Sequence, residues 1–275
     1  MSRPVSDPLS VPLPVVELSR SVWRAGSSSQ ANRPIPEETA IAFSYNHTTY
    51  AVMMATPAEL EDFAVGFSLA ERICDRATDI LALEVVAVEL GIELRMTVDV
   101  AFEQSLRERR RRMAGPSGCG LCGVESLEQA MRVVPPVSAD LTIGFQQLVS
   151  AMSALRKLQT MNQQTSAVHA AAFWTAGEGI VAVREDVGRH NALDKLAGAL
   201  ARMAISARSG VVLLTSRVSI ELVQKAAVMG APIVAAVSAP TALAIRTAEA
   251  AGMTLVGVAR ADGFEVFTHG ARVTA

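Results

Sequence analysis

Three shortages in the 275-residue sequence each exclude a class of protein: it has few cysteines, little net charge and no long apolar run. Three cysteines cannot form a disulfide framework in a chain of this length, which favours a reducing compartment, the cytoplasm. A formal net charge of −2 gives no general attraction to nucleic acid or to an anionic membrane. Prolines interrupt the apolar stretch Val11–Val16, so it does not resemble a signal peptide, and no apolar run approaches the roughly 20 residues that span a bilayer. We therefore expect a cytoplasmic protein with no nucleic-acid partner and no membrane partner.

Hydrophobic residues make up 50% of the sequence, which is enough for one large domain or two smaller ones. Residues 1–36 differ from the rest, because they contain six prolines and three consecutive serines. Such a composition is typical of poorly ordered chain. We predict a flexible N-terminal segment over residues 1–36, with at most one short paired segment near residues 15–18.

A small α+β unit is predicted over residues 37–114. Apolar and β-branched stretches predict four strands, at residues 38–45, 49–55, 80–89 and 92–100. Thr56, Pro57 and Glu59 have the spacing of a helix cap, a first helical residue and a capping box, so a helix is expected to begin at Thr56. A polar helix over residues 102–113 would then lead into the next segment.

Residues 126–275 alternate helices with short apolar strands. Asp140 is predicted to cap a helix that runs to Leu155, and strands are expected at residues 168–174, 180–183, 211–215, 233–237 and 254–258. Strands that are apolar along their whole length are typical of a sheet covered on both faces. The predicted fold class is α/β: a small α+β unit followed by a three-layer domain with a mixed, largely parallel sheet, in the order found in cytidine-deaminase-like domains. Deaminase chemistry itself is excluded, because His169-Ala170-Ala171 lacks the glutamate of the H-x-E motif and no cysteine follows Cys122.

Residues 115–125 are predicted to form a glycine-rich loop that contains Cys119 and Cys122, directly after the basic run 107–112. Glycines leave the sulfurs uncrowded, and nearby guanidinium groups favour the nucleophilic thiolate. The basic run alone is equally compatible with a solvated helix face. Three kinds of chemistry use a C-x-x-C pair: a structural zinc site, a redox-active dithiol, and sulfur transfer through a persulfide. A glycine-rich connector without a second pair of nearby ligands favours sulfur transfer and leaves the other two open.

Polar residues follow four of the predicted strands of the second half. They lie at Arg184–Asn191, Ser216–Ser219, Ser238–Thr241 and Arg260–Gly263. Ligands of such sheets bind beyond the carboxyl ends of the strands, where helix N-termini and arginines favour phosphate oxygens. The sequence therefore predicts a site for a phosphorylated or pyrophosphate ligand at this edge, although any single residue there could instead cap a helix or stabilise a turn.

Four segments together resemble the FdhD/NarQ family of formate dehydrogenase accessory sulfurtransferases: Cys119–Gly123, Arg184–Lys195, Ser219–Ala226 and Ser238–Gly257. The segment REDVGRHNALDK, residues 184–195, is highly specific, whereas a bare C-x-x-C is not. The resemblance runs from about Ile35 to the C-terminus and implies the two-part fold described above. Two departures add side chains near the expected ligand: Gln163-Gln164 stand where the family commonly has two glycines, and Ser216 where it commonly has one.

The resemblance implies that the protein receives sulfur from a cysteine desulfurase as a persulfide. The sulfur would then pass to the molybdenum cofactor, in its bis-molybdopterin guanine dinucleotide form, before the cofactor enters formate dehydrogenase. Cys119 would bear the persulfide, with Cys122 as its partner. The cofactor site would comprise Val258, Ala259, Arg260, Ala261, Asp262 and Gly263, together with Arg189, His190, Arg217 and Ser238.

We expect the molybdenum cofactor to be a bound substrate and expect no permanent cofactor and no metal site. A homodimer is plausible for the family, but the sequence does not locate an interface. The alternative function is a chaperone that binds and delivers the finished cofactor without sulfur chemistry.

Overall fold

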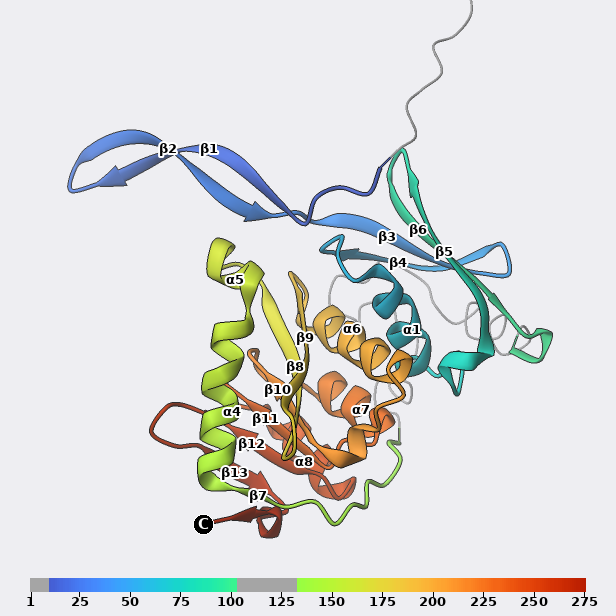
Figure 1. Ribbon diagram of the computed structural model, residues 1–275, viewed down its shortest axis with the longest axis vertical. Coiled ribbons are helices and arrows are strands. Elements are labelled where there is room, and N and C mark those ends of the chain that lie inside the picture. The colour runs from blue at the N-terminus through green and yellow to red at the C-terminus, as the bar shows by residue number, and fades with distance from the viewer. Residues whose placement is uncertain (1–9, 103–132) are drawn as a thin grey trace, which may run out of the picture.

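The computed structural model describes residues 10–102 and 133–275, which form an N-terminal unit, a C-terminal domain and a projecting arm (Figure 1). The described strands of the N-terminal unit form a sheet in the order β4-β3-β6-β5, with helix α1 on one face. The elements are β3 (Thr39–Tyr45), β4 (Thr48–Ala55), α1 (Leu60–Ala70), β5 (Ile80–Val88) and β6 (Gly91–Val98). Phe43 of β3 stacks on Phe67 of α1 with ring centroids 4.1 Å apart, so buried aromatic rings hold the helix on the sheet. The four predicted strands of this unit are confirmed.

Residues 15–36 form an antiparallel hairpin, called the arm from here on, made of β1 (Val15–Arg24) and β2 (Ser27–Pro36). The prediction of a flexible segment is therefore wrong for these residues. Ala25 and Gly26 have φ values of 49° and 80°, as in the two-residue turns whose twist matches that of paired strands. The prolines of β2 do not prevent pairing, because a strand with a free outer edge tolerates residues that lack an N–H.

The C-terminal domain has a sheet between two layers of helices (Figure 1). In the described part of the chain this sheet has six strands, in the order β13-β12-β11-β10-β8-β9. Their bounds are β8 (His169–Thr175), β9 (Gly179–Asp186), β10 (Val211–Leu214), β11 (Ile233–Ala236), β12 (Thr254–Gly257) and β13 (Glu265–Thr268). The three central strands β10, β11 and β12 are parallel, whereas β8, β9 and β13 pair antiparallel. The predicted α/β class and mixed sheet are confirmed. The expectation that the sheet is largely parallel is wrong for the described strands, because two of their five pairings are parallel and three are antiparallel.

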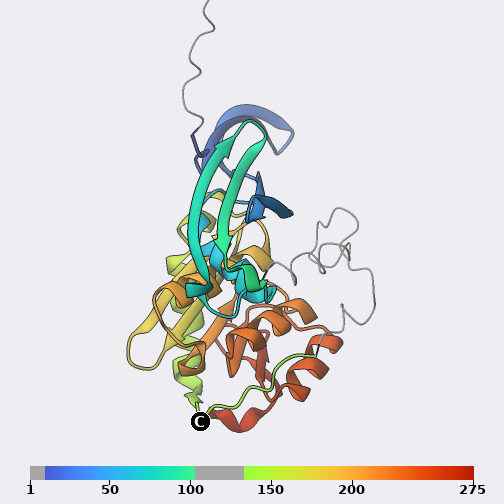
Figure 2. The ribbon, with the colours of Figure 1, turned by 90° about the vertical axis from the view of Figure 1, so that its right-hand side faces the viewer.

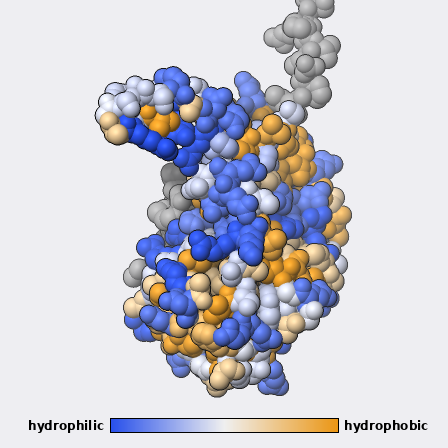
Figure 3. All heavy atoms as spheres, turned by 60° about the vertical axis from the view of Figure 1, so that its left-hand side comes forward, coloured by the Kyte–Doolittle hydropathy of each residue, from blue (hydrophilic) through white to orange (hydrophobic). Residues whose placement is uncertain are grey.

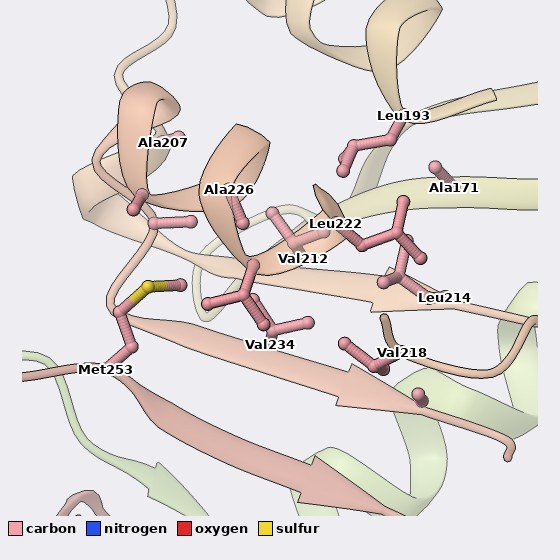
Figure 4. Packing of buried hydrophobic residues seen from close by; sticks show 14 of the residues in the cluster. Ala171, Leu193, Ala207, Val212, Leu214, Val218, Leu222, Ala226, Val234 and Met253 are labelled. Carbon is pink, nitrogen blue, oxygen red and sulfur yellow. The ribbon is translucent and has the colours of Figure 1, made fainter. Parts of the chain in front are cut away.

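Helix α4 (Phe145–Leu158) covers one face of this sheet, and α6 (Arg189–Arg202), α7 (Ile220–Met229) and α8 (Ala242–Ala250) cover the other. Alternate residues of each strand enter different cores. Leu213 packs in the core on the α4 side, whereas Val212 lies against Leu222 of α7 (Figure 4). Both faces of the sheet are therefore apolar, which is why uninterrupted apolar strands predicted the three layers.

None of the described helices is long and apolar enough to cross a membrane. Shorter elements complete the described chain. They are the helix α5 (Thr160–Thr165), the parallel pair β7 (Ile143–Gly144) and β14 (Val273–Thr274), and 3-10 turns at Ala77–Asp79, Val100–Phe102, Ala207–Ser209 and Gly270–Arg272.

Two predicted helix starts are wrong. The Thr56 hydroxyl accepts a hydrogen bond from the Val187 backbone N–H at 3.2 Å, and α1 begins only at Leu60. Asp140 likewise does not cap α4, because the chain first forms β7 and the helix starts after Gly144. In both places a contact distant in sequence replaces the local capping pattern.

Helices α1 and α6 join the N-terminal unit to the C-terminal domain. A Cβ atom on Gly66 of α1 would lie 1.7 Å from the Asp194 backbone oxygen, and one on Gly198 of α6 would lie 1.8 Å from the Asp62 backbone oxygen. Only glycine allows the two backbones to approach this closely. The N-terminal sheet consequently sits beside the α6–α8 layer, as Figure 2 shows with β5 and β6 in green and those helices in orange.

Candidate functional site

The predicted thiol site lies outside the described residues. This applies to Cys119 and Cys122, to the loop 115–125 and to the basic run 107–112. The roles of the two cysteines therefore stay predictions. The third cysteine, Cys74, is buried next to α1, and burial raises the pKa of its thiol to about 12. Cys74 is thus a small apolar core residue and not a nucleophile.

The structure brings together the polar segments that follow β10, β11 and β12, here called the rim: residues 215–219, 237–241 and 258–264. Val218 forms an isolated parallel bridge with Pro240, and the Ala259 N–H donates to the Ala236 carbonyl oxygen at 3.0 Å. The rim therefore contains three of the predicted segments, those around Arg217, Ser238 and Arg260. Their convergence follows from parallel pairing, which aligns the carboxyl ends of neighbouring strands.

Hydrogen bonds of Arg260 hold the loop 258–263 in place. Its guanidinium donates to the carbonyl oxygens of Val237 and of Ala259, the latter at 2.9 Å, and its backbone N–H donates to Gly263 at 2.7 Å. Val258, a β-branched residue, has a positive φ of 52°. Such a conformation is strained and persists where the surroundings impose it, often at binding sites. Arg260 thus shapes the loop, while Ala261 and Asp262 lie exposed on its surface.

A second group of polar residues lies where α6 begins and faces the start of α7. The buried His190 ring has its Nε2 atom 3.5 Å from the Ser219 Oγ atom and 3.8 Å from the Glu221 Oε2 atom. The neighbouring imidazole is the largest of the influences that lower the pKa of Glu221 to about 2, so this carboxylate is ionised. At 3.8 Å the contact is too long for a hydrogen bond. Glu221 Oε2 is therefore buried without a hydrogen-bond partner among the described residues, and so is Arg189 Nε.

His169, at the start of β8, belongs to the same group. Burial first, and then the charges of Arg189 and His190, lower the pKa of His169. The imidazole consequently favours its neutral form, which can accept as well as donate a hydrogen bond. Sequence reasoning identified Arg189 and His190 but missed Glu221, although its place in the first turn of a helix beside the rim was a usable signal.

Most of the charged residues of the segment 184–195 have structural partners. Asp186 and Lys195 are fully buried, with 2.8 Å between Oδ2 and Nζ. Lys195 also donates to the Thr56 carbonyl oxygen at 2.9 Å, and the Thr56 N–H donates to Asp186 at 3.0 Å. Asn191 bridges Asp186 and the Met54 carbonyl oxygen, with 2.9 Å for each bond. We call Thr56, Asp186, Asn191 and Lys195 the joint network, because they fasten the N-terminal unit to the C-terminal domain.

Two further charges of this segment also make structural contacts. Arg184 pairs with Asp62 of α1 at 2.6 Å, and Glu185 accepts the backbone N–H groups of Met161 and Asn162 at 2.8 and 2.9 Å, at the start of α5. The joint network and these contacts were not predicted. A lysine in the apolar stripe of α6 was the available sign that a buried partner exists, since lysine is almost never buried unpaired.

The two departures from the family pattern have local roles. The Gln163 side chain donates to the carbonyl oxygens of Arg156 and Lys157, at the end of α4. The buried Ser216 hydroxyl donates to the Arg217 carbonyl oxygen at 3.1 Å, while the Arg217 residue itself is exposed. Among the described residues, no group of three His, Cys, Asp or Glu side chains is arranged to hold a metal ion.

Comparisons with known proteins agree with this architecture. A family model described as the FdhD/NarQ family matches residues 36–274. The chain is 52% identical over 257 residues to the sulfur carrier protein FdhD of Agrobacterium fabrum strain C58, covering 93% of this chain and 95% of that relative. It is 53% identical over 251 residues to the protein of the same name from Brucella abortus, covering 91% and 93%. The crystal structure of a proposed formate dehydrogenase accessory protein from Desulfotalea psychrophila has the same fold, with a TM-score of 0.74, 24% identity and coverage of 95% and 100%.

Proposed function

The chain belongs to the FdhD/NarQ family, and on this premise we propose that it is a sulfur carrier that takes part in the maturation of formate dehydrogenase. The observation that carries the proposal is its identity of 52% across nearly the whole length of a relative named as a sulfur carrier protein. The pair Cys119 and Cys122 in a glycine-rich loop supports it, because a sulfur carrier needs an accessible thiolate.

The proposed chemistry is a persulfide exchange at Cys119. Its thiolate attacks the outer sulfur of a persulfide on a cysteine desulfurase, the S–S bond of the donor breaks, and the donor cysteine leaves as a thiolate. Cys119 then holds the transferred sulfur as its own persulfide, and Cys122 is the neighbouring thiol that assists its release. In this role the protein is a sulfurtransferase.

The proposed acceptor is the molybdenum cofactor in its bis-molybdopterin guanine dinucleotide form, bound at the rim before it enters formate dehydrogenase. Pyrophosphate groups suit the N-termini of α7 and α8, which begin at the rim, and that of α6 beside it. Arg189 has a buried donor without a partner among the described residues, which favours it for an anionic ligand. His190, Arg217, Ser238 and the loop 258–263 complete the proposed site.

Intact-protein mass spectrometry after incubation with a cysteine desulfurase and free cysteine tests the thiol chemistry. The wild-type protein should gain about one sulfur atom, and Cys119→Ala should abolish the gain. The matched control is Cys74→Ala, which removes a buried thiol whose pKa is raised and should leave the gain unchanged. No sulfur adduct in any form, with cofactor binding intact, would overturn the proposal in favour of a cofactor-delivering chaperone.

The proposal names two transient partners, a cysteine desulfurase as donor and a formate dehydrogenase as recipient. We also propose a homodimer, the assembly that the family resemblance makes plausible.

A further inference from the structure

The arm is exposed along most of its length. Its base is fastened by Arg33, which donates to the Thr165 carbonyl oxygen at 2.9 Å. Towards the tip, Leu18 and Trp23 are 52% and 73% exposed, and Figure 3 shows the arm standing out from the body. A two-stranded hairpin alone is only marginally stable in water. A regular hairpin of two ten-residue strands therefore calls for a surface that covers it.

The N-terminal sheet has a matching exposed feature at its end strand, β5. No strand of the described chain pairs with the outer side of β5, which is nine residues long. Leu81 of this strand is 66% exposed, and Leu90, just after it, is 88% exposed. A long apolar edge strand is a template for pairing with another chain, and proteins normally cover or blunt it.

The arm and the β5 edge have opposite charges. Residues 15–36 contain three arginines and one glutamate, a net charge of +2. Residues 80–90 contain two glutamates and no basic residue, a net charge of −2. Arg20 and Arg24 of β1 and Glu84 and Glu89 at β5 are all exposed. Complementary charge of this kind favours association between the two surfaces.

The two surfaces lie on different sides of the molecule, the arm on one side and the β5–β6 hairpin on the other (Figures 1 and 2). A single arm therefore does not cover the β5 edge of its own chain. A two-fold axis between two copies of the chain would bring the arm of each copy to the β5 edge of the other. Both arms and both edges would then be covered in one symmetric dimer.

We propose that the chain forms a homodimer in which β1 of each arm pairs with β5 of the other copy. The strand β1 is favoured over β2, because β2 contains Pro34 and Pro36, which cannot donate a backbone hydrogen bond. This pairing brings the segment that contains Arg20 and Arg24 alongside the segment that contains Glu84 and Glu89 of the second copy. This inference rests on the proposed homodimer and adds its interface.

Charge reversal tests the interface by size-exclusion chromatography with light scattering over a broad range of concentrations. Arg20→Glu/Arg24→Glu and Glu84→Arg/Glu89→Arg should each raise the dimer dissociation constant by about a hundredfold, because like charges then meet. The variant with all four changes should recover most of the dimer. The matched control is Glu178→Arg, an exposed residue in the β8–β9 turn, which should leave the dimer unchanged. Circular dichroism checks that each variant is folded.

Three outcomes are decisive. The interface is supported if both double variants lose the dimer and the variant with all four substitutions recovers it. A dimer that both double variants retain overturns the interface and leaves the proposed homodimer standing. A wild-type protein that is monomeric at every concentration overturns both, and the persulfide measurement on the same samples shows separately whether the sulfur chemistry survives.

Discussion

Two sets of buried charges lie close to the start of α6, yet they are built differently. One is the joint network around Asp186, and the other is the group of polar residues that contains Arg189 and faces Glu221 through His190. Asp186 accepts from Lys195, Asn191 and backbone N–H groups, so its buried charge is fully compensated. Arg189, three residues later, has a buried Nε without a partner in the described chain, and Glu221 at the start of α7 has a buried Oε2 in the same condition. Buried polar atoms in native proteins are normally hydrogen-bonded. The difference separates charges that hold the structure together from charges whose hydrogen-bonding capacity is not used within the described chain.

The largest effect is expected from breaking the joint network. Lys195→Met leaves the Asp186 carboxylate buried without its cation, which should lower the free energy of unfolding by about 3–5 kcal/mol in urea titrations. Adding Asp186→Asn to that variant should recover a substantial part of the loss, because the uncompensated charge is removed. Equal stability of Lys195→Met and the wild type would contradict a structural role for the pair.

The glycine contact between α1 and α6 gives the next effect. Gly66→Ala should cost about 3 kcal/mol of unfolding free energy, because the added Cβ would overlap the Asp194 backbone oxygen. Gly177→Ala is the matched control, since a Cβ there meets nothing within 4 Å. Thermal unfolding measures the loss of stability in each variant. Similar losses in Gly66→Ala and Gly177→Ala would contradict a close backbone contact between α1 and α6.

Arg189→Met should differ from the two preceding variants, because it should affect ligand binding more than stability. It should weaken binding of the molybdenum cofactor by about tenfold, the effect of losing one charged hydrogen bond, while unfolding changes by less than about 1 kcal/mol. The measurement is the molybdenum and guanine nucleotide retained per protein after purification with the cofactor. Arg156→Met, on the exposed end of α4, serves as the control. Unchanged retention together with a large loss of stability would place Arg189 among the structural charges.

The smallest effect concerns the pH dependence of Glu221. Its pKa is lowered to about 2 in the folded protein, below the ordinary value of 4.5, so its ionised form stabilises the fold above about pH 4.5. That contribution is lost as the pH falls from about 4.5 through 2. Allowing for solvent screening, Glu221→Gln should lower stability by about 1 kcal/mol at neutral pH, and the difference from the wild type should shrink in acid. A difference that grows in acid would show that the carboxylate is destabilising.

Local patterns were sufficient wherever burial or turn geometry alone decides the structure. The apolar run at Val211–Leu214 predicted a strand that is buried on both faces. The short gap between the predicted strands 38–45 and 49–55 is a tight turn, in which Asn46 and His47 have positive φ values. The arm was missed because serines and prolines are typical of disorder, whereas pairing between two strands stabilises them here. The polar segments after the strands predicted the rim, but not which of their side chains face a ligand.

The α/β class, the glycine-rich C-x-x-C motif and the convergence of polar segments can all be inferred from the amino-acid sequence, because apolar periodicity and residue chemistry are local properties. Which charges of the segment 184–195 are structural cannot be inferred in this way, because it depends on contacts between distant parts of the chain. Thr56 and Lys195 are far apart in the chain, and their hydrogen bond exists only because α6 packs against the N-terminal unit. Compensation of a buried charge depends on neighbours in space, and those neighbours are set by packing.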